Sequence, residues 1–266
     1  MSETFIEIVP RCEASLCQSM AELEVSGIPY DGYNIPELIR KGSSYLLPED
    51  VLKLRIEGKI SPQKQLALHL RTRERTVQQT LDRICLVASH KVNIALLVTG
   101  DSLQQQEEQC THAHEVIDSL TDQRPIRIGV TADIYQPNWG RWEQKIQAIG
   151  KTVDTVFTQP VFSVSALDDI DQRTRELLRP DQMYAGITWI TNERSRRYWH
   201  EQNHVPLDHL PRGSSDAEIA HNSISQAADV LREVRQQGYS IYIMLMRNTI
   251  SQLQRVMALS ENIREI

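Results

Sequence analysis

Cysteine is scarce in this sequence, with four residues among 266 and no Cys-x-x-Cys pair. Disulfide-stabilised small domains are far richer in cysteine, so a disulfide scaffold is excluded and reduced thiols are expected. Long apolar runs are also missing: the longest, such as Ile94–Val98 and Ile241–Met246, are too short to span a bilayer. The acidic N-terminus lacks the basic and then apolar order of a signal peptide. We therefore expect a cytoplasmic protein without a membrane segment.

An excess of positive charge is missing as well. Lys plus Arg number 29 against 35 Asp plus Glu, a net charge of −6, which argues against a nucleic-acid partner. No Gly-x-Gly-x-x-Gly motif follows the first predicted strand, which disfavours a dinucleotide-binding open sheet. Low-complexity segments and flexible linkers are also lacking, so no domain boundary is marked. The remaining composition, 40% hydrophobic and 24% charged, is typical of a globular protein with a sizeable core.

Short β-rich runs alternate with longer helical stretches along the whole chain. Nearly continuous apolar runs are typical of parallel strands that are buried on both faces. The predicted strands are 5–10, 28–33, 65–70, 92–98, 126–131, 153–159, 183–188 and 239–246. The predicted helices are 73–89, 107–120, 139–149, 167–178, 216–236 and 250–263. This alternation predicts a single-domain (β/α)₈ TIM barrel over residues 1–266. A doubly wound open sheet is the alternative, because periodicity alone does not separate the two.

Polar side chains occur where the predicted strands end, which is where a barrel enzyme keeps its chemistry. Glu7 lies inside the first apolar run, where a carboxyl group is costly unless it is hydrogen-bonded or neutral. Desolvation raises a carboxyl pKa and can make a general acid at neutral pH. The alternative is that Glu7 points outward and pairs with a basic neighbour. Asp101 follows Gly100 at the end of the fourth strand, where it is either a site residue or a helix N-cap.

Several segments occur in one characteristic order. They are Glu7 in the first strand, Asn93–Asp101, Ile128–Val130, Phe157–Phe162, and Ala185–Ile187 with Asn192. Each motif is loose, but their order and spacing over nearly the whole chain resemble the methylenetetrahydrofolate reductase family. The resemblance implies a (β/α)₈ barrel, in agreement with the alternation of elements.

The resemblance also implies an activity. A hydride would pass from NAD(P)H, usually through bound FAD, to the one-carbon unit of 5,10-methylenetetrahydrofolate. In this scheme Glu7 is the general acid that protonates a folate nitrogen, and Asp101 contacts the pterin and influences the flavin. Gln159 and Asp31 are assigned to substrate binding, and an amide suits a pterin edge because it both donates and accepts hydrogen bonds. The cofactor is assigned to His69, Thr131, Asp133, Arg141 and Lys145.

The departures from the family concentrate on the flavin side. Thr99 stands where the family commonly has an arginine, and the stretch 133–138 lacks the usual histidine. Arg141 and Lys145 lie one helical turn apart and could still hold a pyrophosphate. The sequence therefore predicts weak or absent FAD, with direct transfer of hydride from the nicotinamide.

Other functions stay open at this point. His200-Glu201-Gln202-Asn203-His204 fits the zincin pattern, but Pro206 ends the helix and no third ligand is evident, so no metal is predicted. The chain could instead be a diverged barrel that binds a reduced pterin for a different transfer. It could also be a non-catalytic homologue that binds folate or supports a partner subunit. Retention of Glu7, Asp101 and Gln159 favours catalysis, and a homo-oligomer stays open.

Overall fold

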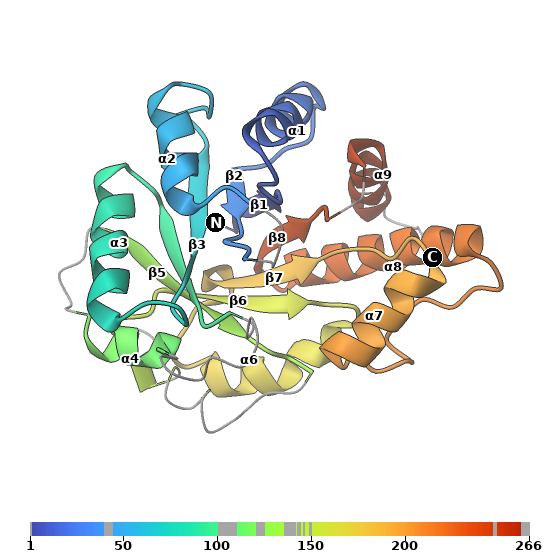
Figure 1. The fold of residues 1–266 in the computed structure, drawn as a ribbon. Helices are drawn as coiled ribbons and strands as arrows, with labels where there is room; N and C mark the ends of the chain where they lie inside the picture. Colours follow the sequence, from blue (N-terminus) through green and yellow to red (C-terminus); the bar gives the residue numbers. More distant parts are fainter. Residues whose placement is uncertain are drawn as a thin grey trace.

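Eight parallel strands form a closed barrel in the computed structural model (Figure 1). The model describes residues 2–39, 45–100, 111–120, 126–135, 142, 145, 147–148, 151–246 and 249–261. The strands are β1 (Thr4–Glu7), β2 (Gly32–Ile35), β3 (Gln65–Arg71), β4 (Ile94–Val98), β5 (Arg127–Ala132), β6 (Thr155–Pro160), β7 (Met183–Ile187) and β8 (Ser240–Met244). Each strand pairs with the next, and β1 pairs with β8. The predicted (β/α)₈ barrel is confirmed, and the open sheet is excluded because β8 closes against β1.

Helices surround the barrel as an outer layer (Figure 1). They are α1 (Glu13–Val25), α2 (Pro48–Ile56), α3 (Val77–Ser89), α4 (Ala113–Asp118), α6 (Asp168–Thr174), α7 (Glu193–Asn203), α8 (Asp216–Gln236) and α9 (Ile250–Glu261), with short 3₁₀ turns η1 (Val164–Leu167) and η2 (Pro180–Gln182). The predicted helix 139–149 falls largely outside the described residues. Among the helices that the structure describes, none is both long enough and apolar enough to cross a membrane.

Helix α8 illustrates how sequence pattern sets a helix. Ile224, Ala227, Leu231 and Val234 recur at spacings of three and four residues, and all are buried. The bounds agree with the predicted helix 216–236. The N-cap is Ser215, whose hydroxyl accepts a hydrogen bond from the Glu218 amide.

The second strand differs from its prediction. It was expected at 28–33 but comprises Gly32–Ile35, and Pro29 lies outside it. Gly32 is required here because a Cβ at this position would lie 2.5 Å from the Gln65 carbonyl oxygen of the adjacent strand. The shift moves Asp31 from the end of the strand to its start, which matters for the candidate site.

Side chains inside the barrel form two layers near its amino-terminal end. A polar layer joins Glu3 to Arg127, whose Nη1 lies 3.1 Å from Glu3 Oε2, and to the Tyr184 hydroxyl. Above it lies an apolar layer in which the Phe157 and Tyr184 rings stack at 4.3 Å. Its other members are Phe5, Ala67, Ile94, Leu96 and Tyr242. Because this layer fills the barrel, only side chains beyond it can meet a ligand at the carboxyl end.

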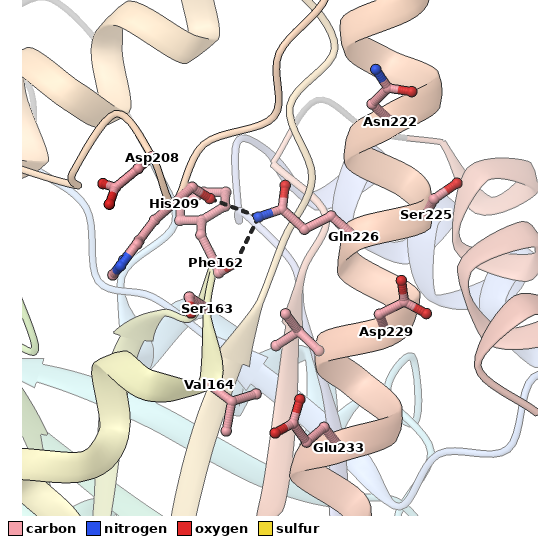
Figure 2. A pocket seen from close by; sticks show the side chains of 11 residues that line it. Phe162, Ser163, Val164, Asp208, His209, Asn222, Ser225, Gln226, Asp229 and Glu233 are labelled. Atoms are coloured by element: carbon pink, nitrogen blue, oxygen red, sulfur yellow. Dashed lines mark hydrogen bonds between the residues drawn. The ribbon is translucent and has the colours of Figure 1, made fainter.

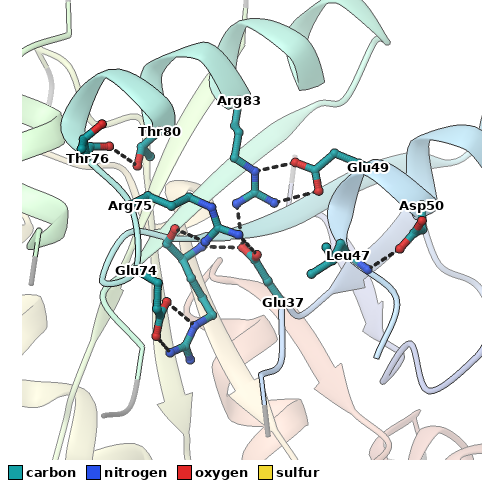
Figure 3. A network of polar contacts seen from close by, with 10 residues as sticks. Glu37, Leu47, Glu49, Asp50, Glu74, Arg75, Thr76, Thr80 and Arg83 are labelled. Carbon is teal, nitrogen blue, oxygen red and sulfur yellow. Dashed lines mark hydrogen bonds and ion pairs between the residues drawn. The ribbon is translucent and has the colours of Figure 1, made fainter. Parts of the chain in front are cut away.

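A buried ion network ties the carboxyl ends of β2 and β3 to the neighbouring helices (Figure 3). The Glu37 carboxylate is fully buried and accepts bonds from Arg75 Nη2 at 2.7 Å and Arg83 Nη1 at 3.0 Å. It also accepts the Arg71 backbone amide at 2.7 Å. Arg83 in turn binds both carboxylate oxygens of Glu49 on α2, at 2.5 and 3.0 Å. The network therefore holds the β2–α2 and β3–α3 connections together.

We expect Glu37→Gln to lower the free energy of unfolding by about 3–5 kcal/mol, because the largely buried Arg75 loses its carboxylate partner and Arg83 keeps only that of Glu49. Urea denaturation measures the change. Lys53→Ala, which breaks an exposed pair with Glu57, is the control and should leave the midpoint unchanged. Equal midpoints for the wild type and the Glu37 variant would show that the network does not stabilise the fold.

Candidate functional site

Three polar side chains from successive strands meet at the carboxyl end of the barrel. Glu7 lies two residues beyond the interior residue Phe5, and His69 lies two beyond the interior residue Ala67, so both face the barrel axis. Asn34 on β2 stands between them in register, opposite Glu7 on one side and Ala67 on the other. The strand alternation thus places a carboxyl, an amide and an imidazole directly above the apolar layer.

Hydrogen bonds connect these three side chains. Asn34 Nδ2 donates to Glu7 Oε2 at 2.9 Å, and Asn34 Oδ1 lies 3.0 Å from His69 Nε2. An amide oxygen only accepts, so His69 Nε2 carries the hydrogen in this bond. The Glu7–Asn34–His69 chain therefore has a defined direction, from the imidazole N–H through the amide to the carboxyl group.

Burial keeps Glu7 uncharged near neutral pH. The residue is 6% exposed, and removal from water raises its pKa to about 8, although the hydrogen bond from Asn34 opposes the rise. Among the described residues, no Lys or Arg forms an ion pair with Glu7. Tyr242 on β8 is the titratable neighbour, and burial together with the Glu7 charge raises its pKa well above the usual value. The alternative that Glu7 points outward and pairs with a basic neighbour is excluded, because its side chain is buried.

His69 is also held uncharged. Burial lowers its pKa to about 3, so the imidazole is neutral over the physiological range. Together with the Nε2 hydrogen, this neutrality fixes one tautomer, in which Nδ1 is an acceptor. The imidazole thus serves Asn34 as a hydrogen-bond donor without adding charge to the site.

Gln159 and Thr131 lie near the carboxyl ends of adjacent strands, on the far side of the barrel from Glu7. Thr131 pairs in register with Phe157, and the register shifts between Phe157 and Pro160, so Gln159 lies in an irregular part of β6. Gln159 Oε1 is buried and accepts no hydrogen bond from any described residue. Buried polar atoms normally have a partner, so this oxygen is suited to accept a hydrogen bond from a bound molecule.

The remaining predicted residues lie elsewhere. Asp31 precedes β2, at the amino-terminal edge of the barrel, where its carboxylate accepts the Thr4 amide at 2.7 Å. It is therefore at the opposite end from Glu7, and its placement in the substrate site was wrong because the strand begins later than predicted. Asp133 is exposed just beyond β5 and accepts the Tyr135 amide at 3.0 Å. Asp101 and Arg141 lie outside the described residues.

Lys145 and the zincin motif are placed by their own contacts. Lys145 Nζ donates to the Thr131 carbonyl at 2.9 Å, so it lies beside the end of β5.

Helix α7 ends at Asn203, and His204 follows in the left-handed region with φ 56°. His200 Nδ1 lies 2.9 Å from the Val205 carbonyl oxygen. In the part of the chain that the structure describes, no three His, Cys, Asp or Glu side chains cluster as metal ligands would.

A second concave surface lies against α8 (Figure 2). Its volume is about 470 Å³, and it is lined by residues of the loop after β6, the segment before α8, and α8 itself. Gln226 Nε2 donates to the carbonyls of Phe162 and His209, at 2.7 and 2.6 Å, and so joins the three walls. None of the predicted site residues that the structure describes lines this groove.

Asn34 and Tyr242 are members of the site that sequence reasoning missed. A polar residue in the apolar stretch Tyr33–Ile35 would have indicated Asn34 if the strand had been placed correctly. Tyr242 resembles any aromatic residue in a buried strand, and the sequence carries no signal for its proximity to Glu7.

The sequence matches none of the protein-family models and none of the curated proteins with which it was compared. Solved structures do resemble the fold. A Clostridium thermocellum protein described as binding two copies of 5-methyl-5,6,7,8-tetrahydrofolic acid has a TM-score of 0.64 and 15% identity over 98% of this chain and 94% of that one. The Bacillus cereus spore cortex-lytic enzyme SleL has a TM-score of 0.54 and 11% identity over 98% of this chain and 75% of that one.

A third structure, HPPK-DHPS in complex with substrates, has a TM-score of 0.55 and 12% identity. The match covers 98% of this chain but 51% of that chain. At these identities the likeness concerns the fold, and barrels of this kind carry unrelated activities.

We expect Glu7 to cost stability as the pH rises. In the unfolded chain its carboxyl ionises near 4.5, whereas in the folded protein it stays protonated up to about 8. The folded state is therefore disfavoured by up to about 1.4 kcal/mol per pH unit across that interval. Glu7→Gln keeps an acceptor for Asn34 and removes the titration, so its stability relative to the wild type should grow from pH 5 to pH 8. Urea denaturation at both pH values measures this difference, and a pH-independent difference would contradict the buried neutral acid.

Proposed function

We propose that this barrel binds a reduced folate at its carboxyl end and reduces the bridging carbon of 5,10-methylenetetrahydrofolate with hydride from NAD(P)H. The observation that carries the proposal is Glu7, a buried and uncharged acid that faces the barrel axis and is held by Asn34. An acid with a pKa near neutrality is what protonation of a weakly basic nitrogen requires at physiological pH.

Two independent observations support a folate as the ligand. The ordered motifs around Glu7 and Gln159 resemble those of the methylenetetrahydrofolate reductase family. A structural neighbour over nearly the whole chain is described as binding 5-methyl-5,6,7,8-tetrahydrofolic acid. The second observation concerns binding only, so the reductive step rests on Glu7 and on the resemblance.

The chemistry that Glu7 would supply is a single proton transfer. Its carboxyl group protonates the folate nitrogen at one end of the methylene bridge, and the bond from that nitrogen to the bridging carbon breaks. The carbon remains attached to the other nitrogen as an iminium ion, which accepts hydride from the reduced nicotinamide to become a methyl group. Glu7 then regains a proton from solvent, so one proton and one hydride are consumed per turnover.

Gln159 would hold the pterin. Its buried Oε1 has no hydrogen-bond donor among the described residues, and a pterin edge offers N–H groups to such an acceptor. Thr131, near the carboxyl end of the adjacent strand β5, would line the same site. A ligand donor at Gln159 would satisfy an atom that is otherwise costly to bury.

We propose that the protein works without a bound flavin. His69 hydrogen-bonds to Asn34, and Lys145 donates to the Thr131 carbonyl. Thr99 cannot supply the charge of the arginine that the family commonly has in its place. In the proposed reaction, hydride therefore passes directly from the nicotinamide to the folate, without FAD.

Paired variants separate catalysis from binding. Glu7→Gln should bind 5-methyltetrahydrofolate like the wild type but lose about 10²–10⁴-fold in turnover, because the amide has no acidic proton. Gln159→Ala should instead weaken folate binding while Glu7 stays in place. Calorimetric titration measures binding, and oxidation of NADH or NADPH with methylenetetrahydrofolate measures turnover.

Full activity of Glu7→Gln would remove the acid assignment. Tight folate binding by the wild type without any turnover would instead identify a non-catalytic folate-binding barrel. Failure of the wild type to bind folate would overturn the proposal as a whole.

We also expect the purified protein to be colourless and its turnover to be independent of added FAD. Losing one charged phosphate contact costs roughly 1.5–3 kcal/mol, or about 10–150-fold in affinity. The visible absorption spectrum of the purified protein is the measurement. A yellow protein with near-stoichiometric FAD would contradict direct transfer and restore a two-step route through the flavin.

A further inference from the structure

Asn34 is the one hydrogen-bond partner of Glu7 that the described residues provide. Its donated bond occupies Glu7 Oε2, and the unprotonated oxygen of a neutral carboxyl group is the better acceptor. The hydroxyl proton therefore belongs on Oε1. A carboxyl group without such a partner could carry its proton on either oxygen, and only one of the two arrangements would present it to a ligand.

The Asn34 amide also contacts His69. Its oxygen lies on the imidazole side, where it accepts a hydrogen bond from His69 Nε2. The amide nitrogen is then left facing Glu7. His69 thus acts on Glu7 through Asn34 and makes no hydrogen bond to Glu7 itself.

We propose that Asn34 is a positioning residue for Glu7: it holds Oε2 as an acceptor so that the transferable proton lies on Oε1, and His69 fixes the direction of the Asn34 amide. This inference rests on the proposed function in taking Glu7 as the proton donor. The Asn34 hydrogen bond also lowers the pKa of Glu7, because a bond donated to a carboxyl group stabilises its charged form more than its neutral form.

The groups around Glu7 define what else can influence its titration. On β8, Met244 stands opposite Glu7 in register, and Tyr242 is the titratable neighbour. On the other side, β2 contributes Asn34, with His69 of β3 behind it. Tyr242 stays neutral over the working range, because burial raises its pKa, and His69 is neutral as well. Among the described neighbours of Glu7, the hydrogen bond from Asn34 is therefore the one that a substitution can remove to change the Glu7 pKa.

Titration of the Glu7 carboxyl by NMR tests the proposal without any folate. Protein labelled with ¹³C at the glutamate side-chain carboxyl is used, and the Glu7 resonance is identified by its absence from Glu7→Gln. Asn34→Leu should raise the Glu7 pKa by about 1–2 units, because the bond to the charged form is lost. Asn34→Asp, which keeps the shape but removes the donor and adds charge, should raise it at least as much. Met244→Leu is the matched control on the other neighbouring strand and should leave it unchanged.

A double-variant cycle tests the role of His69. His69→Leu should raise the Glu7 pKa in the wild-type background, because the amide can then turn its oxygen toward Glu7. In the Asn34→Leu background the same change should have no further effect. An unchanged pKa in both Asn34 variants, or an equal His69 effect in both backgrounds, would overturn the proposal. Because no folate is present, that outcome is distinct from a failure of folate binding or turnover.

Discussion

The burial of one carboxyl group above an apolar layer is the constraint on which this site depends. Glu7 ends a strand whose interior neighbour Phe5 is fully buried, and a charge at that depth would have to be solvated by the protein. Among the described residues, Glu7 has one neutral amide donor and no ion-pair partner, so its carboxyl group stays protonated. Burial of Glu7 costs stability, but it also leaves a carboxyl group that can donate a proton at neutral pH.

Rigid surroundings keep this arrangement in place. The polar layer of Glu3 and Arg127 closes the amino-terminal end, and the aromatic stack of Phe157 and Tyr184 fills the middle. At the carboxyl end, the buried Glu37 carboxylate joins the connections that follow β2 and β3, the two strands that carry Asn34 and His69. The hydrogen-bonded chain from His69 to Glu7 therefore stands on strands that are anchored at both ends.

The sequence predicted the barrel because short, nearly continuous apolar runs and helical stripes are local patterns, and α8 agreed in both bounds for that reason. Glu7 was found because a lone carboxyl in an apolar run is locally anomalous. Asn34 was missed because its role depends on the register between β1 and β2, which no local pattern reveals. The same strand was placed too early, at Ile28–Tyr33 instead of Gly32–Ile35, and this error moved Asp31 to the wrong end of the barrel.

A crystal structure of the protein with 5-methyltetrahydrofolate tests the central claim most directly. The account predicts the pterin inside the carboxyl end of the barrel, with a folate nitrogen within about 2.6–3.2 Å of Glu7 Oε1 and a pterin N–H donated to Gln159 Oε1. A folate bound in the groove along α8, or at the barrel mouth without contact to Glu7, would contradict it.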